Sequence, residues 1–393
     1  MLIYIVIFLF LLIPVIRFDL MRIEGNKDLW FYSSLVLLIL LAGLRYRLGS
    51  DTLIYMRFFE NYPSIQELSD FDFENASFNP FWYIFNAPFV SLKSFTLFQL
   101  VHVTIVNSIF FWFFRRYVPQ AYFTAILIYY FGSFFYFNMD ILREVLCICV
   151  LLLAYPFLEK RKFFPYFLLC IFALYIHFSS VVMLLIPLTL LFKRDNLWLY
   201  VLAMVAVVLS FTVFDIVAYV LNIAFEGQLA EKIQSYLMHE TPNIFGILRQ
   251  LLSIIPFMLM AFIRGKNHYD NDKMIGAILI MIVVWQAAGM FVGDLTRFAN
   301  YFMPFGIVFM LNTFFVNYWD LMKRTYTRIL VFGALFLYVF SLSLFYLKDR
   351  SEDYPGGRNY HFYVPYYSVL NPQVDERRET LVTNLRWGKV SFE

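Results

Sequence analysis

Four short segments place charged or ionisable side chains within or beside long apolar blocks: residues 43–51, 138–144, 177–180 and 294–301. A charge at membrane depth is energetically costly, so such residues indicate function by default. These segments are therefore the first candidates for a site that binds a ligand or performs chemistry.

Three of these segments contain arginine: Arg45 with Arg47, Arg143, and Arg297. A guanidinium group is planar and permanently charged, and it matches a phosphate group with two parallel hydrogen bonds. His177 lies in the remaining segment, and imidazole takes up a proton near neutral pH. Together these residue types indicate a site for a phosphate or pyrophosphate group, with a base that removes a proton from a hydroxyl group.

Each segment also has a purely structural interpretation. The arginines of segment 43–51 could extend their charged ends to lipid headgroups. Two segments hold an aspartate three positions before an arginine, Asp140–Arg143 and Asp294–Arg297, which allows an ion pair on one helix face. His177 could be a hydrogen-bonded histidine at the membrane interface. A shared site is favoured because all four segments fall near the same membrane face in the threading below.

The composition assigns the chain to the membrane proteins. Of its 393 residues, 61% are hydrophobic and only 15% are charged. Soluble domains are about half apolar and about a quarter charged. A water-soluble enzyme, a disordered protein and a fibrous protein are therefore excluded.

A spanning helix needs about 20 mostly apolar residues, and lipid requires each backbone group to be satisfied within its own segment. The apolar blocks are 2–16, 29–44, 80–92, 96–114, 120–137, 141–158, 163–192, 197–224, 245–263, 274–292, 298–316 and 329–347. They predict an all-α, polytopic integral membrane protein with about 12 transmembrane helices, in a range of about 11 to 14.

Short loops rich in lysine and arginine predict the orientation, because such loops stay in the cytoplasm. On this basis, residues 1–347 form a transmembrane domain, and the loop 45–79 and the tail 348–393 lie outside. The block 80–92 contains two prolines and an asparagine, and we expect it to be a re-entrant or interfacial helix. The block 163–192 is expected to cross twice, with its turn at His177–Ser180.

Several functional classes lack support. The net charge of +3 is too small to indicate a nucleic-acid partner. Cys147, Cys149 and Cys170 lie in apolar blocks without a Cys-x-x-Cys pattern, so we expect neither a disulfide nor a metal–thiolate site. No nucleotide-binding loop or zinc-protease motif is present, and we expect no metal and no cofactor.

Five stretches occur in a characteristic order: AGLRYRLGSDTLIYMRFF (42–59), NPFWYIFNAPF (79–89), NMDILREVLCI (138–148), LYIHFSSVVMLLIPL (174–188) and RFANYF (297–302). In order and spacing they resemble the EpsG family of bacterial exopolysaccharide membrane proteins, related in role to the Wzy polysaccharide polymerases. The resemblance extends along most of residues 1–347.

The resemblance implies a multi-pass protein of the bacterial inner membrane that polymerises a capsule, exopolysaccharide or O-antigen at the outer leaflet. Its substrates would be oligosaccharide repeats linked to undecaprenyl pyrophosphate. A sugar hydroxyl of one repeat would attack the anomeric carbon of another, and undecaprenyl pyrophosphate would leave. Such a glycosyltransferase needs neither a metal nor a nucleotide.

The residues carry expected roles within this reaction. The groups expected to bind the pyrophosphate are Arg45, Arg143 and Arg297. The catalytic candidates are His177 as the base, with Asp140 and Asp294 as orienting groups. The candidates for contact with the sugar or the acceptor are Arg47, Asp51, Tyr55 and Tyr301.

Two other functions fit the composition: a transporter or flippase of the lipid-linked oligosaccharide, and a membrane acyltransferase of exported sugars. A flippase would need charges near the membrane midplane, whereas the unusual charges gather at one face. The expected partners are the polyprenyl-pyrophosphate-linked oligosaccharides, membrane lipids, and flippase and chain-length regulator proteins, with no nucleic acid.

Overall fold

The computed structural model describes residues 2–74, 76, 78–191, 296–317, 322–348 and 358–387. Throughout this described part the regular structure is helical. The predicted spans 197–224, 245–263 and 274–292, and the candidate Asp294, lie outside the described residues. Contacts divide the chain into two compact units. Unit 1 comprises Met1–Phe157, Lys162–Ser180 and Asp320–Glu393, and unit 2 comprises Leu158–Arg161 and Val181–Trp319.

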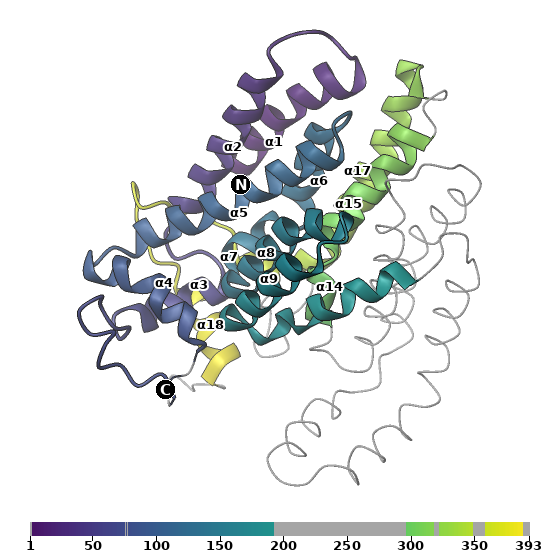
Figure 1. Cartoon of the computed structure of the whole chain (residues 1–393). Helices are drawn as coiled ribbons and strands as arrows, with labels where there is room; N and C mark the ends of the chain where they lie inside the picture. The colour runs from purple at the N-terminus through teal and green to yellow at the C-terminus, as the bar shows by residue number, and fades with distance from the viewer. Residues whose placement is uncertain are drawn as a thin grey trace, which may run out of the picture. The chain divides into compact units, whose positions relative to one another are not determined.

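Most of the described helices belong to unit 1 (Figure 1). They are α1 (Leu2–Pro14) with the π-helix η1 (Val15–Leu20), α2 (Lys27–Gly43), α3 (Ser50–Phe59), α4 (Pro80–Ser91), α5 (Phe95–Tyr117), α6 (Tyr122–Gly132), α7 (Phe134–Met139), α8 (Leu142–Glu159), α9 (Phe163–Ile176), α17 (Thr325–Lys348), η6 (Asn359–Phe362) and α18 (Glu376–Trp387). The 3-10 helix η2 (Phe178–Leu191) follows α9, and unit 2 contains α14 (Thr296–Asn300), α15 (Met303–Asn312) and η5 (Thr313–Asn317).

Three of the described helical stretches are long and apolar enough to cross a membrane: Leu2–Leu20, Phe95–Tyr117 and Thr325–Lys348. Shorter apolar helices occupy Tyr122–Gly132, Phe163–Ile176, Phe178–Leu188 and Met303–Phe315. These helices indicate an integral membrane protein of the all-α class. The number of about 12 spans stays a prediction, as do the transmembrane domain 1–347 and the outer placement of the tail.

In the core of unit 1, α2 lies along α5 (Figure 1). The two helices approach closely at Gly43, where an added Cβ would lie 2.6 Å from a methyl carbon of Leu100. Phe110, Phe111 and Phe114 of α5 are fully buried. Aromatic rings therefore fill much of this core, and their edge-to-face contacts contribute beyond simple area burial.

The apolar blocks are interrupted at polar residues. The block 120–137, predicted as one helix, is divided at Ser133 into α6 and α7, so that prediction was wrong. The division follows Gly132, and glycine is a poor helix former. The block 163–192 is interrupted at His177, because α9 ends at Ile176 and η2 begins at Phe178, while its double crossing with a turn at His177–Ser180 stays a prediction.

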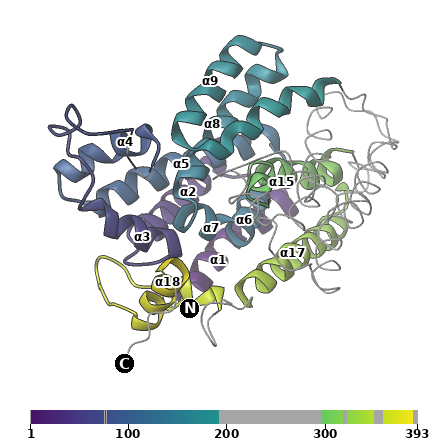
Figure 2. The same ribbon diagram turned by 90° about the horizontal axis from the view of Figure 1, so that it is seen from below.

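The tail folds back on the loop between α2 and α3 (Figure 2). Three backbone hydrogen bonds join the two segments: Tyr46 N–H to the Tyr367 carbonyl, Gly49 N–H to the Phe362 carbonyl, and Val369 N–H to the Leu44 carbonyl, each at 2.9 Å. The contact α18 makes with α3 continues this packing. The loop that carries Arg45 and Arg47 is thus covered by residues more than 300 positions away in the sequence.

Candidate functional site

The first turn of α3 is held by a carboxylate from another helix boundary. Asp140, between α7 and α8, accepts hydrogen bonds at Oδ1 from the Ser50 N–H (2.6 Å) and the Ser50 hydroxyl (3.0 Å). The N–H groups of a first helical turn have no partner within the helix, so Asp140 caps α3 from outside it. Gly49 precedes this turn with a φ of +91° and lies against the Met139 backbone, where a side chain would collide. Only glycine suits that position.

Arg45 lies beneath the same turn and is 1% exposed. One terminal nitrogen donates to the Ala42 carbonyl, and the other donates to the Thr52 hydroxyl at 3.0 Å. Thr52 in turn donates to the Met139 carbonyl. The interpretation of Arg45 as a side chain that extends to lipid headgroups was therefore wrong, because its charged end is enclosed by protein. Its binding of pyrophosphate stays a prediction.

Arg143, in the first turn of α8, presents its guanidinium group differently. Its Nε donates to the Tyr55 hydroxyl at 2.9 Å, and its Cζ lies 4.5 Å from the ring centre of Phe78. Among the described residues, no protein group accepts a hydrogen bond from its two terminal nitrogens. Arg143 does not pair with Asp140 in this part of the chain, because that carboxylate binds Ser50 and Tyr363 instead. The ion-pair interpretation of Asp140 and Arg143 was wrong.

One face of α3 brings these residues together. Thr52 and Tyr55 are three positions apart, and side chains at this spacing lie on the same helix face. Thr52 binds Arg45 and Tyr55 binds Arg143, while Ser50 binds Asp140. We call Arg45, Asp140 and Arg143, with their α3 partners Ser50, Thr52 and Tyr55, the α3 site. Tyr55 is itself buried, with its ring 4.8 Å from that of Trp82.

His177, at the C-terminal end of α9, packs against α8 one helical turn beyond Arg143. The thiol of Cys147, four positions after Arg143, lies 4.0 Å from the His177 carbonyl oxygen. The imidazole Nδ1 accepts a hydrogen bond from the Ser179 N–H at 3.2 Å and lies 2.7 Å from the Ser179 hydroxyl oxygen. Because Nδ1 accepts a hydrogen bond from a backbone N–H, the ring's own proton is placed on Nε2 in the neutral tautomer.

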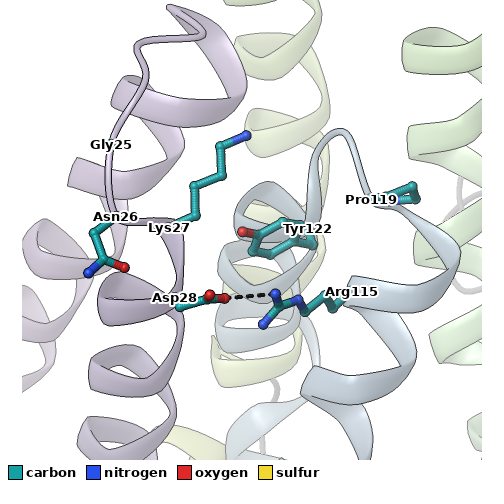
Figure 3. A pocket seen from close by; sticks show the side chains of 7 residues that line it. All are labelled: Gly25, Asn26, Lys27, Asp28, Arg115, Pro119 and Tyr122. Atoms are coloured by element: carbon teal, nitrogen blue, oxygen red, sulfur yellow. Dashed lines mark ion pairs between the residues drawn. The ribbon is translucent and has the colours of Figure 1, made fainter.

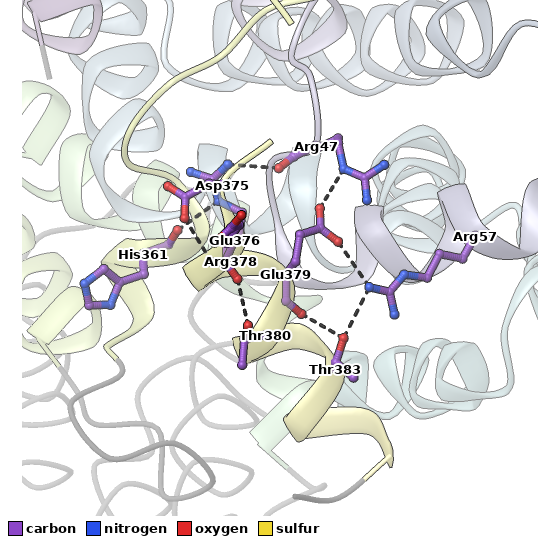
Figure 4. Close-up of polar contacts among 9 residues, drawn as sticks. All are labelled: Arg47, Arg57, His361, Asp375, Glu376, Arg378, Glu379, Thr380 and Thr383. Carbon is purple, nitrogen blue, oxygen red and sulfur yellow. Dashed lines mark hydrogen bonds and ion pairs between the residues drawn. The ribbon is translucent and has the colours of Figure 1, made fainter. Parts of the chain in front are cut away.

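Arg47 belongs to a second group of arginines, which binds the tail (Figure 4). The Glu379 carboxylate of α18 accepts hydrogen bonds from Arg47 Nε at 2.6 Å and from Arg57 Nη2 at 3.1 Å. Arg378 is 1% exposed and donates to the carbonyls of His361 (2.9 Å), Arg47 (3.0 Å) and Pro365 (2.7 Å). We call Arg47, Arg57, Arg378 and Glu379 the tail clamp.

The tail clamp is also coupled electrostatically. Partial burial alone would raise the pKa of Glu379, but the hydrogen bonds and charges of Arg47 and Arg57 outweigh it and hold the pKa below its ordinary value. The hydrogen bond to Glu379 correspondingly raises the pKa of Arg47. Both shifts favour the charged forms of Glu379 and Arg47.

The three other described candidates are divided between α3 itself and unit 2. Asp51 is half-buried in the first turn of α3, next to Ser50. Arg297 is exposed on α14 and Tyr301 is buried just after it, and both belong to unit 2. The joint pyrophosphate site of Arg45, Arg143 and Arg297 thus stays a prediction.

Sequence reasoning missed the residues that support the site. Tyr363 of the tail donates from its hydroxyl to Asp140 Oδ2. Ser50, Arg378 and Glu379 were not singled out either. The segment ERRETLVTNLRW of α18 has the polar composition of a solvated surface, so no local signal pointed to these contacts.

A polar recess lies at the other end of α2 (Figure 3). It is lined by Gly25, Asn26, Lys27, Asp28, Arg115, Pro119 and Tyr122. Arg115 forms an exposed ion pair with Asp28 at 2.7 Å. The 17 residues of α2 separate this recess from the α3 site, a helix length of about 25 Å. The two features therefore form separate polar regions.

Comparison with known proteins gives one match. The model of the EpsG family matches residues 28–368, which include α2 to α9, α17 and the tail up to Ser368. No curated protein matches the chain, and no solved structure matches it.

Proposed function

The chain belongs to the EpsG family, and from this premise we propose that it polymerises oligosaccharide repeats linked to undecaprenyl pyrophosphate at the outer leaflet of the bacterial inner membrane. Membership of the family indicates a role in exopolysaccharide synthesis. The polymerase activity, the lipid-linked substrates, and flippase and chain-length regulator proteins as partners are part of the proposal.

The observation that carries the proposal is the state of Arg143. Its guanidinium group is fixed through Nε and a flanking ring, while both terminal nitrogens lack a protein acceptor among the described residues. Those two nitrogens form the fork that binds a phosphate group with two parallel hydrogen bonds. A group held in this way is preorganised for an anion and needs little rearrangement to bind it.

The proposed reaction forms one glycosidic bond. A hydroxyl oxygen of the acceptor repeat attacks the anomeric carbon of the donor, and the bond from that carbon to the pyrophosphate oxygen breaks. Undecaprenyl pyrophosphate leaves with the electron pair of the broken bond. The leaving group is an anion, so it requires positive charge rather than a proton, and Arg143 supplies that charge.

The proton of the attacking hydroxyl needs an acceptor, and His177 is the proposed one. Its unprotonated nitrogen, Nδ1, faces the Ser179 hydroxyl at 2.7 Å. In the proposal the acceptor's proton moves to the Ser179 oxygen while the Ser179 proton moves to Nδ1. Both residues end with the correct valence, and the imidazolium later releases its proton to water.

A deletion strain tests the function. With a polymerase deleted, cells should export single repeats and make no long polymer, and wild-type protein should restore polymer length on gels. Arg143→Ala should fail to restore it at normal protein levels. Repeats that stay inside the deletion strain would instead support a flippase and overturn the proposal.

A further inference from the structure

A side chain of the tail, Tyr363, contacts the α3 site directly. Tyr363 is 3% exposed, and its hydroxyl donates to Asp140 Oδ2 while Ser50 occupies Oδ1. Its hydroxyl also lies 3.3 Å from that of Tyr346 on α17, and its carbonyl accepts from the Tyr4 hydroxyl at 2.6 Å. Tyr363 therefore links α1, α17 and the tail to the carboxylate that caps α3.

From Asp140 a path through α3 leads to the guanidinium group of Arg143. Asp140 fixes Ser50 at the start of α3, and Tyr55, on the second turn of α3, fixes Nε of Arg143. The Asp140 carbonyl also accepts from the Leu142 N–H at 3.1 Å, at the start of the helix that carries Arg143. Asp140 thus contacts the first residue of the helix that carries Tyr55 and, through its backbone carbonyl, the first residue of the helix that carries Arg143.

We infer that the tail is a working part of the site, and that Tyr363 is a positioning residue that acts through Asp140 and α3 on Arg143. This inference rests on the proposed function, because its activity test measures polymer formation. Tyr363 itself touches no reacting group. Its hydroxyl keeps the Asp140 carboxylate in the orientation that caps α3, because a buried carboxylate that loses a donor turns towards other partners.

The main test is Tyr363→Phe, with Tyr366→Phe as the matched control. Tyr366 lies on the same tail segment and donates from its hydroxyl to the Leu41 carbonyl at 2.9 Å, so both variants remove one phenolic hydrogen bond. Hydrogen exchange of residues 45–55 in purified full-length protein reports on α3 without any substrate. We expect faster exchange in Tyr363→Phe and unchanged exchange in Tyr366→Phe.

The activity readout is kcat and KM for polymer formation from a synthetic lipid-linked repeat in proteoliposomes. Tyr363→Phe should lower kcat/KM by about tenfold, the equivalent of one lost hydrogen bond to a charged group, at the protein yield and melting temperature of the control. Asp140→Asn should lower it as well, and Tyr363→Phe should add little in that background, because contacting residues on one path are not additive.

The outcomes separate the inference from the proposed function. If the two phenylalanine variants behave alike in hydrogen exchange and activity, Tyr363 is not a positioning residue. The same follows if the effects of Tyr363→Phe and Asp140→Asn on kcat/KM are fully additive. If exchange changes in Tyr363→Phe while polymer formation does not, the inference is also overturned. If wild-type protein forms no polymer from the repeat while the exchange difference persists, the proposed function fails and the coupling of tail and α3 stands.

Discussion

Arg143 contacts α3 through Tyr55, and the tail clamp includes Arg57 of the same helix, but the two groups of arginines differ in which acceptors their N–H groups bind. In the clamp, Glu379 and a set of backbone carbonyls accept from Arg47, Arg57 and Arg378. At Arg143 the protein uses only Nε within the described residues, and it supports the guanidinium group with the Phe78 ring. The clamp arginines join two segments of the chain, whereas within the described residues the terminal nitrogens of Arg143 have no protein acceptor. If Arg143 binds a ligand as proposed, the number of protein acceptors, rather than the residue type, separates it from the structural arginines.

The largest effect is expected at His177, which follows α9 and packs against α8, the helix that carries Arg143. His177→Gln keeps hydrogen-bonding capacity but cannot take up a proton at neutral pH, and losing a base costs about 10² to 10⁴ in rate. Polymer length on gels, with protein level measured in parallel, checks this. Full-length polymer from the glutamine variant would make His177 a structural residue, and Ser179→Ala should then also be silent.

The next largest effect is expected in the tail clamp, at Arg378. Arg378→Met removes three hydrogen bonds from a buried charged group, and hydrogen bonds of this kind contribute about 1.5–3 kcal/mol each. We expect the free energy of unfolding to fall by about 3 kcal/mol or more, seen as a lower melting temperature in detergent. Arg377→Met, at the exposed neighbouring position, is the matched control and should change little. Equal melting temperatures for the two variants would show that the hydrogen bonds of Arg378 do not stabilise the protein.

The smallest effect is the pH dependence of tail docking. Because the folded pKa of Glu379 lies below its unfolded value, its contribution is present above the unfolded pKa and is lost as the pH falls through the lowered folded pKa. Protease protection of the tail should therefore decrease between about pH 5 and pH 3, and Glu379→Gln should flatten that dependence. The ion pairs are partly exposed, so the change should be about 1 kcal/mol or less. The same acid-induced loss in the glutamine variant would contradict this assignment.

How much the sequence could predict differs between the parts of the molecule. Among the described residues, the apolar runs predicted most of the apolar helices, since lipid leaves few alternatives for the backbone, whereas α3 and α18 were not predicted. The interruption at His177 was visible as a polar group in an apolar block. The partner of Asp140 was not predictable. The sequence offers Arg143 three residues away, but the chain selects Ser50 and Tyr363, which are 90 and 223 positions distant. Whether the N–H groups of an arginine find acceptors within the protein depends on which carbonyl groups the tertiary structure brings near it. The local sequence does not contain that information.

The most direct measurement is the affinity of purified protein in nanodiscs for labelled undecaprenyl pyrophosphate. Arg143→Lys keeps the charge but loses the bidentate fork, and Arg57→Lys makes the same change in the tail clamp. We expect Arg143→Lys to weaken the binding of undecaprenyl pyrophosphate by about tenfold or more, equivalent to roughly 1.4 kcal/mol. We expect Arg57→Lys to bind it with wild-type affinity. Wild-type affinity in Arg143→Lys, or an equal loss in both variants, would contradict the proposed role of Arg143.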